Sequence, residues 1–136
     1  MKPDHPIAVT EADLVKLSNL REHRALMQEL DRALVLSSAS VPPDLVTMNS
    51  TVVYEDEDTG MLREITIVYP PEADSRKGNV SVLAPLGTAL LGLSVGQSIV
   101  WPFPGGSLRT LRVVQLLYQP EAAERKARVA QDSIDR

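Results

Sequence analysis

The chain has 136 residues, of which 43% are hydrophobic and 24% charged, a composition typical of one soluble globular domain. It contains no cysteine, so disulfides, cysteine nucleophiles and cysteine-ligated zinc are excluded, and a reducing cytoplasm is the expected compartment. The net charge is −4, and the lysines and arginines are spread along the chain. Because independent binding to duplex nucleic acid usually needs a basic face, a protein partner is favoured over nucleic acid.

The first forty residues show two amphipathic helical patterns. Thr10 suits the N-cap of a first helix. The apolar side of this helix is formed by Leu14, Val15 and Leu17. A turn is expected around Asn19–Glu22, followed by a second helix over Glu22–Leu36, which would reach only about 20 Å. Two adjacent helices with a short connection predict an antiparallel hairpin, a coiled-coil stub.

Ser37–Pro43 is the clearest boundary in the chain, because polar serines followed by two prolines cannot continue a helix. The boundary divides the chain into a helical hairpin in residues 1–40, a second domain in residues 44–119 and a tail in residues 120–136. The tail favours a helix, but only Val129 and Ile134 could anchor it to a core. We expect it to be a frayed helix or disordered.

Beyond Pro43 the pattern changes to β-strands. Ser50–Tyr54 and Leu62–Tyr69 flank the acidic turn Glu55–Gly60, which predicts a β-hairpin. Calcium-binding loops separate their ligands with spacer residues and place a bidentate Glu further on, a pattern that Glu55–Asp58 lacks. A solvated hairpin tip is therefore expected here rather than a metal site.

No charged residue occurs from Gly78 to Leu108. Proline and glycine interrupt this run at turn-like intervals, and no apolar stretch approaches the ~20 residues that span a bilayer, so a folded core is expected rather than a membrane span. The expected elements are a strand, a short helix and two further strands, at Val80–Ala84, Pro85–Leu91, Ser98–Trp101 and Leu108–Tyr118. The chain as a whole predicts an α+β fold, in which the helical hairpin precedes a twisted antiparallel sheet with one short helix across its face.

The sequence shows no assembled active site. His5 and His23 have no local co-ligands, no serine lies in a Gly-x-Ser-x-Gly elbow, and no phosphate-binding loop is present. We therefore expect neither enzymatic activity nor a cofactor or metal ion. Nothing in the sequence indicates an obligate oligomer, and a monomer is expected.

The uncharged run resembles the C-terminal domain of the Gre transcript-cleavage factors of bacterial RNA polymerase. The residues that carry this resemblance are Ser81, Pro85-Leu86-Gly87, Ala89-Leu90-Leu91-Gly92, Val95-Gly96 and Pro104-Gly105-Gly106. Upstream, Val46–Val52 looks like the strand with which that domain begins, so the similarity spans roughly Val46 to Tyr118.

Within that superfamily the chain looks most like the regulators of nucleoside diphosphate kinase (Rnk), which join the same domain to a shortened helical hairpin. The stretches Asp44–Ser50 and Tyr118–Ala123 look like that family's own sequence. The resemblance implies an FKBP-like domain in a cytoplasmic bacterial protein that binds RNA polymerase at the rim of its secondary channel. Nucleic acid would then be contacted only through the polymerase complex, and the hairpin would point toward or into the channel.

The expected hairpin tip departs from the Gre pattern. Gre factors carry acidic residues at the tip of a long hairpin, where they help to hold a catalytic magnesium ion. Here the candidate channel contacts are Arg21, Glu22, His23 and Arg24, with a single carboxylate among cations. Such a tip is poorly suited to recruit a cation, and the hairpin is short, so stimulation of transcript cleavage is not expected. Gln97 stands where Gre domains often carry Asp.

The resemblance implies a non-catalytic regulator that occupies the channel entrance and competes with cleavage factors. Its candidate polymerase contacts are Ser81, Leu83, Ala84 and Pro85, although these residues could instead only shape the edge of the sheet. One alternative is direct action on nucleoside diphosphate kinase. Another is FKBP-like prolyl isomerisation, for which Trp101 and Phe103 are the only large rings in the central stretch.

Overall fold

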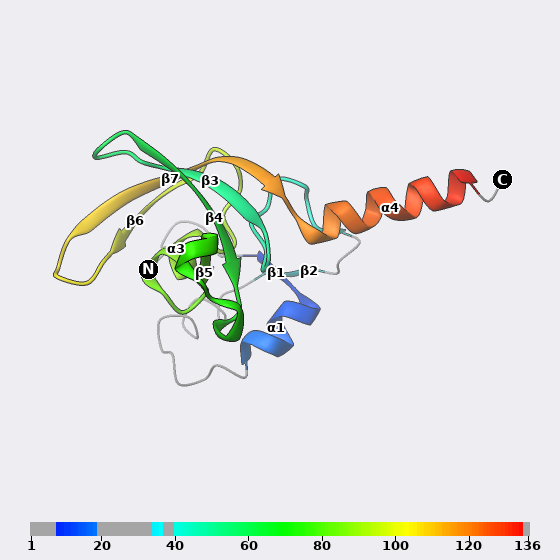
Figure 1. The fold of residues 1–136 in the computed structure, drawn as a ribbon, viewed down its shortest axis with the longest axis horizontal. Coiled ribbons are helices and arrows are strands. Elements are labelled where there is room, and N and C mark those ends of the chain that lie inside the picture. The colour runs from blue at the N-terminus through cyan, green and yellow to red at the C-terminus, as the bar shows by residue number, and fades with distance from the viewer. Residues whose placement is uncertain (1–7, 19–33, 37–39, 135–136) are drawn as a thin grey trace.

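The computed structural model of the chain describes residues 8–18, 34–36 and 40–134 (Figure 1). Its main feature is a curled five-stranded sheet with the strand order β5-β4-β3-β7-β6. The strands are β3 (Thr51–Asp56), β4 (Met61–Val68), β5 (Asn79–Ser81), β6 (Ser98–Pro102) and β7 (Leu108–Tyr118). Helix α3 (Pro85–Leu90) lies next to β5 and β6, across the open side of the curl (Figure 1). The α+β class and the hairpin of β3 and β4 are therefore confirmed.

The expectation of an antiparallel sheet is wrong for one pair of strands. β5 runs parallel to β4, with Val80 opposite Ile67. After β4 the chain does not turn back directly but passes through two 3₁₀ turns, η2 (Pro70–Glu72) and η3 (Ser75–Lys77), before β5 begins. Parallel neighbours need a crossover connection of this kind, whereas a tight turn gives an antiparallel pair.

The core lies between the concave face of the sheet and α3. Side chains alternate along β3, so that Val52 and Tyr54 point inward, and Val52 is opposite the apolar Ile65 of β4 and Leu116 of β7. Other fully buried members of the core are Met48, Ile67, Val82, Leu90, Leu91 and Leu111. Each such aliphatic side chain contributes roughly 1.5–3 kcal/mol on burial, which explains why the uncharged run forms the centre of the domain.

The N-terminal segment differs from the predicted hairpin where the structure describes it. Helix α1 (Glu11–Ser18) is present, but Val15 is 68% exposed and does not belong to its apolar side, which is formed by Leu14 and Leu17. Residues Leu34–Leu36, predicted as the end of a second helix, form strand β2. β2 pairs in parallel with β1 (Ala8–Thr10). The backbone groups of Leu34–Leu36 therefore pair with those of a distant strand rather than within a helix. The rest of the predicted second helix and the tip lie outside the described residues.

Helix α4 (Pro120–Ile134) follows β7 and extends away from the sheet (Figure 1). Residues 120–134 of the tail are therefore helical. Its first turn is attached to the body, because the Thr47 hydroxyl donates to Glu121 Oε1 at 2.7 Å. None of the helices in the described ranges combines the length and the apolarity that a membrane crossing requires.

Candidate functional site: the β5–α3 junction and the concave cavity

The β5–α3 junction contains the four residues predicted as polymerase contacts. Ser81, Leu83, Ala84 and Pro85 are all half-buried. The Leu83 amide donates to Ser81 Oγ at 3.1 Å, and the Ala84 amide donates to the Ser81 carbonyl at 3.0 Å. Pro85 opens α3, where its missing N–H costs no helical hydrogen bond. The four residues therefore form one tight turn with a partly exposed surface.

Buried neighbours hold this turn in place. Val82 is fully buried and its amide donates to the Val68 carbonyl at 2.9 Å. The Thr88 hydroxyl donates to the Val82 carbonyl at 2.6 Å, which joins α3 to the turn. Gly87 lies so close to the turn that a Cβ atom would be 2.3 Å from the Ser81 carbonyl oxygen. The position of the turn is consequently fixed by hydrogen bonds to its backbone and by the close approach of α3 at Gly87.

A cavity of about 320 Å³ lies beside this junction, on the concave face of the curled sheet. Leu86, the residue after Pro85, forms part of its wall. The strand register explains the other walls, because Tyr54 is opposite Arg63 while Asp56 is opposite both Met61 and Leu111, and directly opposite residues share a face. Among the described residues, the lining consists of Tyr54, Asp56, Thr59, Met61, Arg63, Leu86, Phe103, Arg109 and Leu111.

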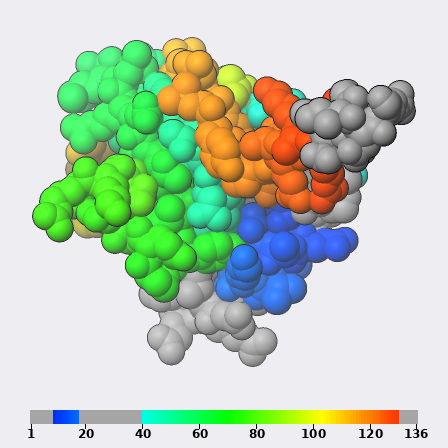
Figure 2. Space-filling view, turned by 45° about the vertical axis from the view of Figure 1, so that its right-hand side comes forward, coloured from blue at the N-terminus to red at the C-terminus, as the bar shows by residue number. Residues whose placement is uncertain are grey.

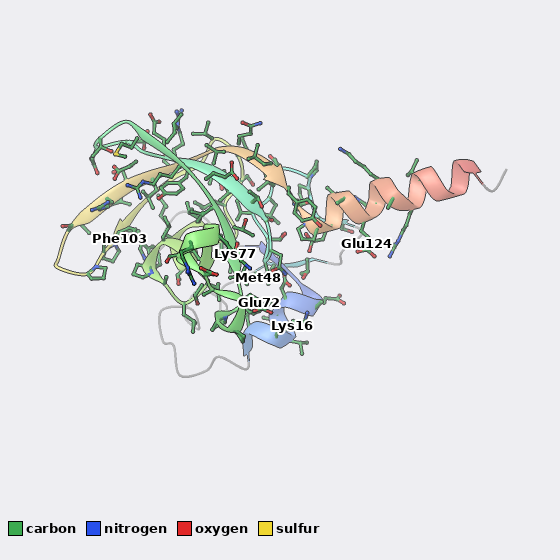
Figure 3. All side chains as sticks on the ribbon, in the orientation of Figure 1. Lys16, Met48, Glu72, Lys77, Phe103 and Glu124 are labelled. Carbon is green, nitrogen blue, oxygen red and sulfur yellow. The ribbon has the colours of Figure 1, made fainter. Side chains whose placement is uncertain are left out.

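Asp56 is the acidic group of the cavity and is only 8% exposed. Its Oδ1 accepts the Asp58 amide at 3.0 Å, and its Oδ2 accepts Arg109 Nη1 at 3.4 Å. The Arg109 guanidinium also lies 5.4 Å from the centre of the Phe103 ring, within range of a cation–π interaction. Phe103 follows β6 at the outer end of the curl (Figure 3). The prediction of a solvated acidic tip is thus wrong for Asp56, which positions Arg109.

Tyr54 contributes a neutral hydroxyl to the same wall. Burial raises the pKa of Tyr54, and the nearby charges of Arg63 and Arg109 oppose that rise only in part. A phenol that stays protonated can donate a hydrogen bond at any physiological pH. The wall therefore combines two cations, one carboxylate, one phenol and several apolar side chains, which can contact both the polar and the apolar parts of a bound group.

Sequence reasoning missed the cavity. Tyr54, Asp56, Arg63 and Arg109 belong to three strands, and only the paired register brings them together. The alternation of each strand was a usable signal, since it puts Tyr54 and Asp56 on the face that also carries Val52. The predicted tip residues Arg21, Glu22, His23 and Arg24 lie outside the described residues. No group of three or more potential metal ligands occurs within the described ranges.

Comparison with known proteins places this site in a family. Residues 41–118 match the family described as "Transcription elongation factor, GreA/GreB, C-term". A protein named regulator of nucleoside diphosphate kinase, from Escherichia coli (strain K12), is 50% identical over 99 residues, which is 73% of each chain. The chain belongs to the GreA/GreB family and, within it, to the regulators of nucleoside diphosphate kinase.

Two GreA/GreB elongation factors are similar to the chain at lower identity. The chain is 37% identical to the transcription elongation factor GreA of Solidesulfovibrio magneticus (strain ATCC 700980 / DSM 13731 / RS-1) over 94 residues, which is 69% of this chain and 57% of that one. The structure of a GreA/GreB elongation factor from Nitrosomonas europaea superposes with a TM-score of 0.69 at 38% identity, covering 85% of this chain and 100% of that one. The fold is therefore shared with a Gre-type factor.

The GreA/GreB segment contains the whole sheet, α3, the β5–α3 junction and the cavity. Helix α1 and helix α4 lie outside it and are joined to it by a polar cluster. Tyr69 donates its hydroxyl to Asp13 Oδ1 at 3.1 Å, and the Met48 amide donates to Asp13 Oδ2 at 3.4 Å. Figure 2 shows residues 8–18, in blue, next to the start of α4.

The position of Asp13 in this cluster makes its ionised form less favourable than it would be in water. Burial raises its pKa, the hydrogen bond from Tyr69 opposes the rise, and the negative charge of Glu121 adds to it. Burial likewise raises the pKa of Tyr69, and the neighbouring Asp13 reinforces that effect. The Lys16 ammonium lies 5.7 Å from the centre of the Tyr69 ring (Figure 3). These contacts attach the N-terminal segment to the family domain.

Proposed function

We propose that this protein is a non-catalytic regulator of Gre type, which binds RNA polymerase at the entrance of the secondary channel and competes there with transcript-cleavage factors. Membership of the GreA/GreB family supports a role in transcription. The observation that carries the proposal is the turn with the half-buried Ser81, Leu83, Ala84 and Pro85, which is followed directly by Leu86 in the wall of the cavity. A rigid turn beside a cavity can receive a side chain of a protein partner without reorganising, which limits the entropic cost of binding.

The chemistry of the site supports binding without catalysis. Among the described residues of its lining the cavity has no serine, cysteine or histidine, and its carboxylate, Asp56, already accepts hydrogen bonds from the Asp58 amide and Arg109. The cavity gives little support to the alternative of prolyl isomerisation. Its described lining has only two aromatic rings, Tyr54 and Phe103, and the buried Trp101 is not part of it. The predicted hairpin tip has a single carboxylate, which argues against stimulation of transcript cleavage.

A pull-down of RNA polymerase with purified wild type and Pro85→Asp tests the proposal. Aspartate at position 85 would put a charge at the centre of the proposed contact while remaining acceptable in a first helical turn. Pro120→Asp is the matched control, because Pro120 also opens a helix and is half-buried, but lies at the start of α4. We expect wild type and Pro120→Asp to recover the polymerase and Pro85→Asp to lose it.

The outcomes separate the site from the function. Equal recovery by a folded Pro85→Asp protein would refute the contact surface, and failure of wild type to recover polymerase would refute the function itself. In a second experiment, increasing amounts of wild type should reduce the transcript cleavage that a Gre factor stimulates in stalled complexes. Unchanged cleavage at saturating wild type would contradict competition at the channel entrance.

A second candidate is direct action on nucleoside diphosphate kinase, which the name of the 50% identical relative favours. Co-purification distinguishes the two candidates, because an affinity-tagged protein should retain either the polymerase or the kinase from defined mixtures of purified components. Retention of the kinase alone would replace the polymerase proposal.

A further inference from the structure

Two guanidinium groups face the same cavity from opposite sides of β3. Arg63 comes from β4 and Arg109 from β7, and Tyr54 and Asp56 of β3 lie on the wall between them. Each guanidinium has five N–H donors arranged to bind a carboxylate with two parallel hydrogen bonds. The cavity therefore offers more donors than its own acidic residue can use.

Most of this donor capacity remains available. Asp56 accepts one long hydrogen bond from Arg109, whose side chain is 54% exposed. Among the described residues, no other carboxylate lies within ion-pair distance of Arg109, and none lies within that distance of Arg63. Asp56 and the Phe103 ring hold Arg109 in place, which reduces the side-chain entropy that a ligand would have to overcome.

The charge of the cavity favours a single negative charge. Two arginines and one aspartate give a formal charge of +1 (2 − 1) for the lining. A phosphate group with two charges would lie close to the Asp56 carboxylate, and repulsion would offset much of its attraction to the arginines. A carboxylate matches the charge, and its two oxygens match the planar guanidinium.

The remaining walls favour an apolar group next to that carboxylate. Leu86, Phe103 and Leu111 provide apolar surface in the same cavity, whose volume of about 320 Å³ can enclose more than one side chain. Free acidic metabolites without an apolar part would leave this surface wet, whereas an acidic residue beside an aliphatic one on a protein would cover it.

We propose that the cavity binds an acidic side chain together with an adjacent aliphatic side chain of the protein partner, and that Arg63 and Arg109 select the carboxylate. The identity of the partner as RNA polymerase rests on the proposed function, whereas the chemistry recognised by the cavity does not. Leu86 connects this cavity to the Ser81–Pro85 turn, so the two surfaces would form one binding site.

Titration of the full chain with the peptide acetyl-Leu-Glu-Leu-amide, followed by NMR chemical shifts, tests the cavity directly. The matched probe acetyl-Leu-Gln-Leu-amide has the same shape without the charge. We expect the Glu peptide to shift the amide signals of β3, β4 and β7 around the cavity, and to bind about tenfold or more tightly than the Gln peptide, as charge-assisted hydrogen bonds imply. Arg63→Gln should abolish this preference.

Arg76→Gln is the control for loss of one positive charge, because Arg76 belongs to η3, is 94% exposed and is not part of the cavity. Equal binding of the two peptides, no binding of the Glu peptide at millimolar concentration, or a preference unchanged in a folded Arg63→Gln protein would each overturn the inference. Peptide selectivity without polymerase recovery would refute only the proposed function. Polymerase recovery without peptide selectivity would refute only the carboxylate site.

Discussion

Replacing Gly87 by alanine should destabilise the protein, although the same change stabilises most helices. A Cβ atom at this position would lie 2.3 Å from the Ser81 carbonyl oxygen and 3.0 Å from the Val82 Cα. Both obstacles are backbone atoms of the β5–α3 junction, so no side-chain rotation can remove the overlap. Gly87 is not among the residues with positive φ, and the cost of the substitution is therefore steric.

The expected magnitude follows from two opposing effects. Overpacking costs about 1–3 kcal/mol, and a backbone obstacle favours the upper end of this range. Alanine in place of a helical glycine gains about 1 kcal/mol. The net loss of about 2 kcal/mol should lower the urea midpoint by about 1 M for an m-value of about 2 kcal/mol/M. Unfolding can be followed by the fluorescence of Trp101, the single tryptophan, which is buried.

Gly60→Ala is the matched control for this experiment. Gly60 has φ +76° and open space around its Cβ position, so alanine there costs about 1–2 kcal/mol of left-handed backbone strain without a clash. A Gly87→Ala protein that is as stable as wild type would refute the steric argument. If the Gly87→Ala protein is folded but no longer recovers polymerase in the pull-down, the turn must keep its position for binding.

Two further predictions concern buried carboxylates. The pKa of Asp13 is raised above its ordinary value of 3.8, so the native state binds this proton more tightly than the unfolded state, and stability falls as pH rises through the raised pKa. The stability of Asp13→Asn relative to wild type in urea unfolding should therefore increase as pH rises from 3.8 through the raised pKa, and a difference independent of pH would contradict this. Asp56→Ala should lose about 1–3 kcal/mol, because the Asp58 amide and Arg109 lose their acceptor, whereas the exposed Glu57→Ala should change stability by less than about 0.5 kcal/mol. Equal melting temperatures of these two variants would contradict a positioning role for Asp56.

The sheet was predictable where its signals are local. β-Branched residues indicated β3 and alternation indicated β4, and Pro85 together with the glycine after Leu91 marked both ends of α3. Gly92 has φ +82°, a conformation that other residues adopt at a cost, so its presence at the helix end is a direct sequence signal. These features depend on neighbours within a few residues, so the local sequence is sufficient to predict them.

The misassigned elements depend on contacts between distant residues. β1 and β2 are only three residues long, and their pairing joins Ala8 to Leu34 across the chain. The parallel direction of β5 follows from the path through η2 and η3 rather than from its own residues. Register shifts between β3 and β7 also decide which residues meet across the sheet, and alternation alone does not reveal them.

Asp56 illustrates the limit most clearly. In the sequence it is one of four consecutive acidic residues, all equally suited to a solvated turn. In the structure it ends β3 on the concave face, accepts the Asp58 amide and holds Arg109 on the Phe103 ring, while Glu55 on the opposite face pairs with Arg112 at 2.8 Å. Composition could not separate these roles, because the face of each residue is fixed by strand phase.

The attachment of the N-terminal segment and the Ser81–Pro85 turn depend on pH to different degrees. The N-terminal segment is held through Asp13, whose charge depends on pH, whereas the Ser81–Pro85 turn is held by the buried Val82, the Thr88 hydroxyl and the absence of a side chain at Gly87. Arginine stays protonated throughout the physiological range, and the raised pKa of Tyr54 keeps its phenol neutral there. The proposed docking surface therefore keeps its shape and charge when Asp13 titrates, so a change in the attachment of the N-terminal segment need not weaken binding by the cavity.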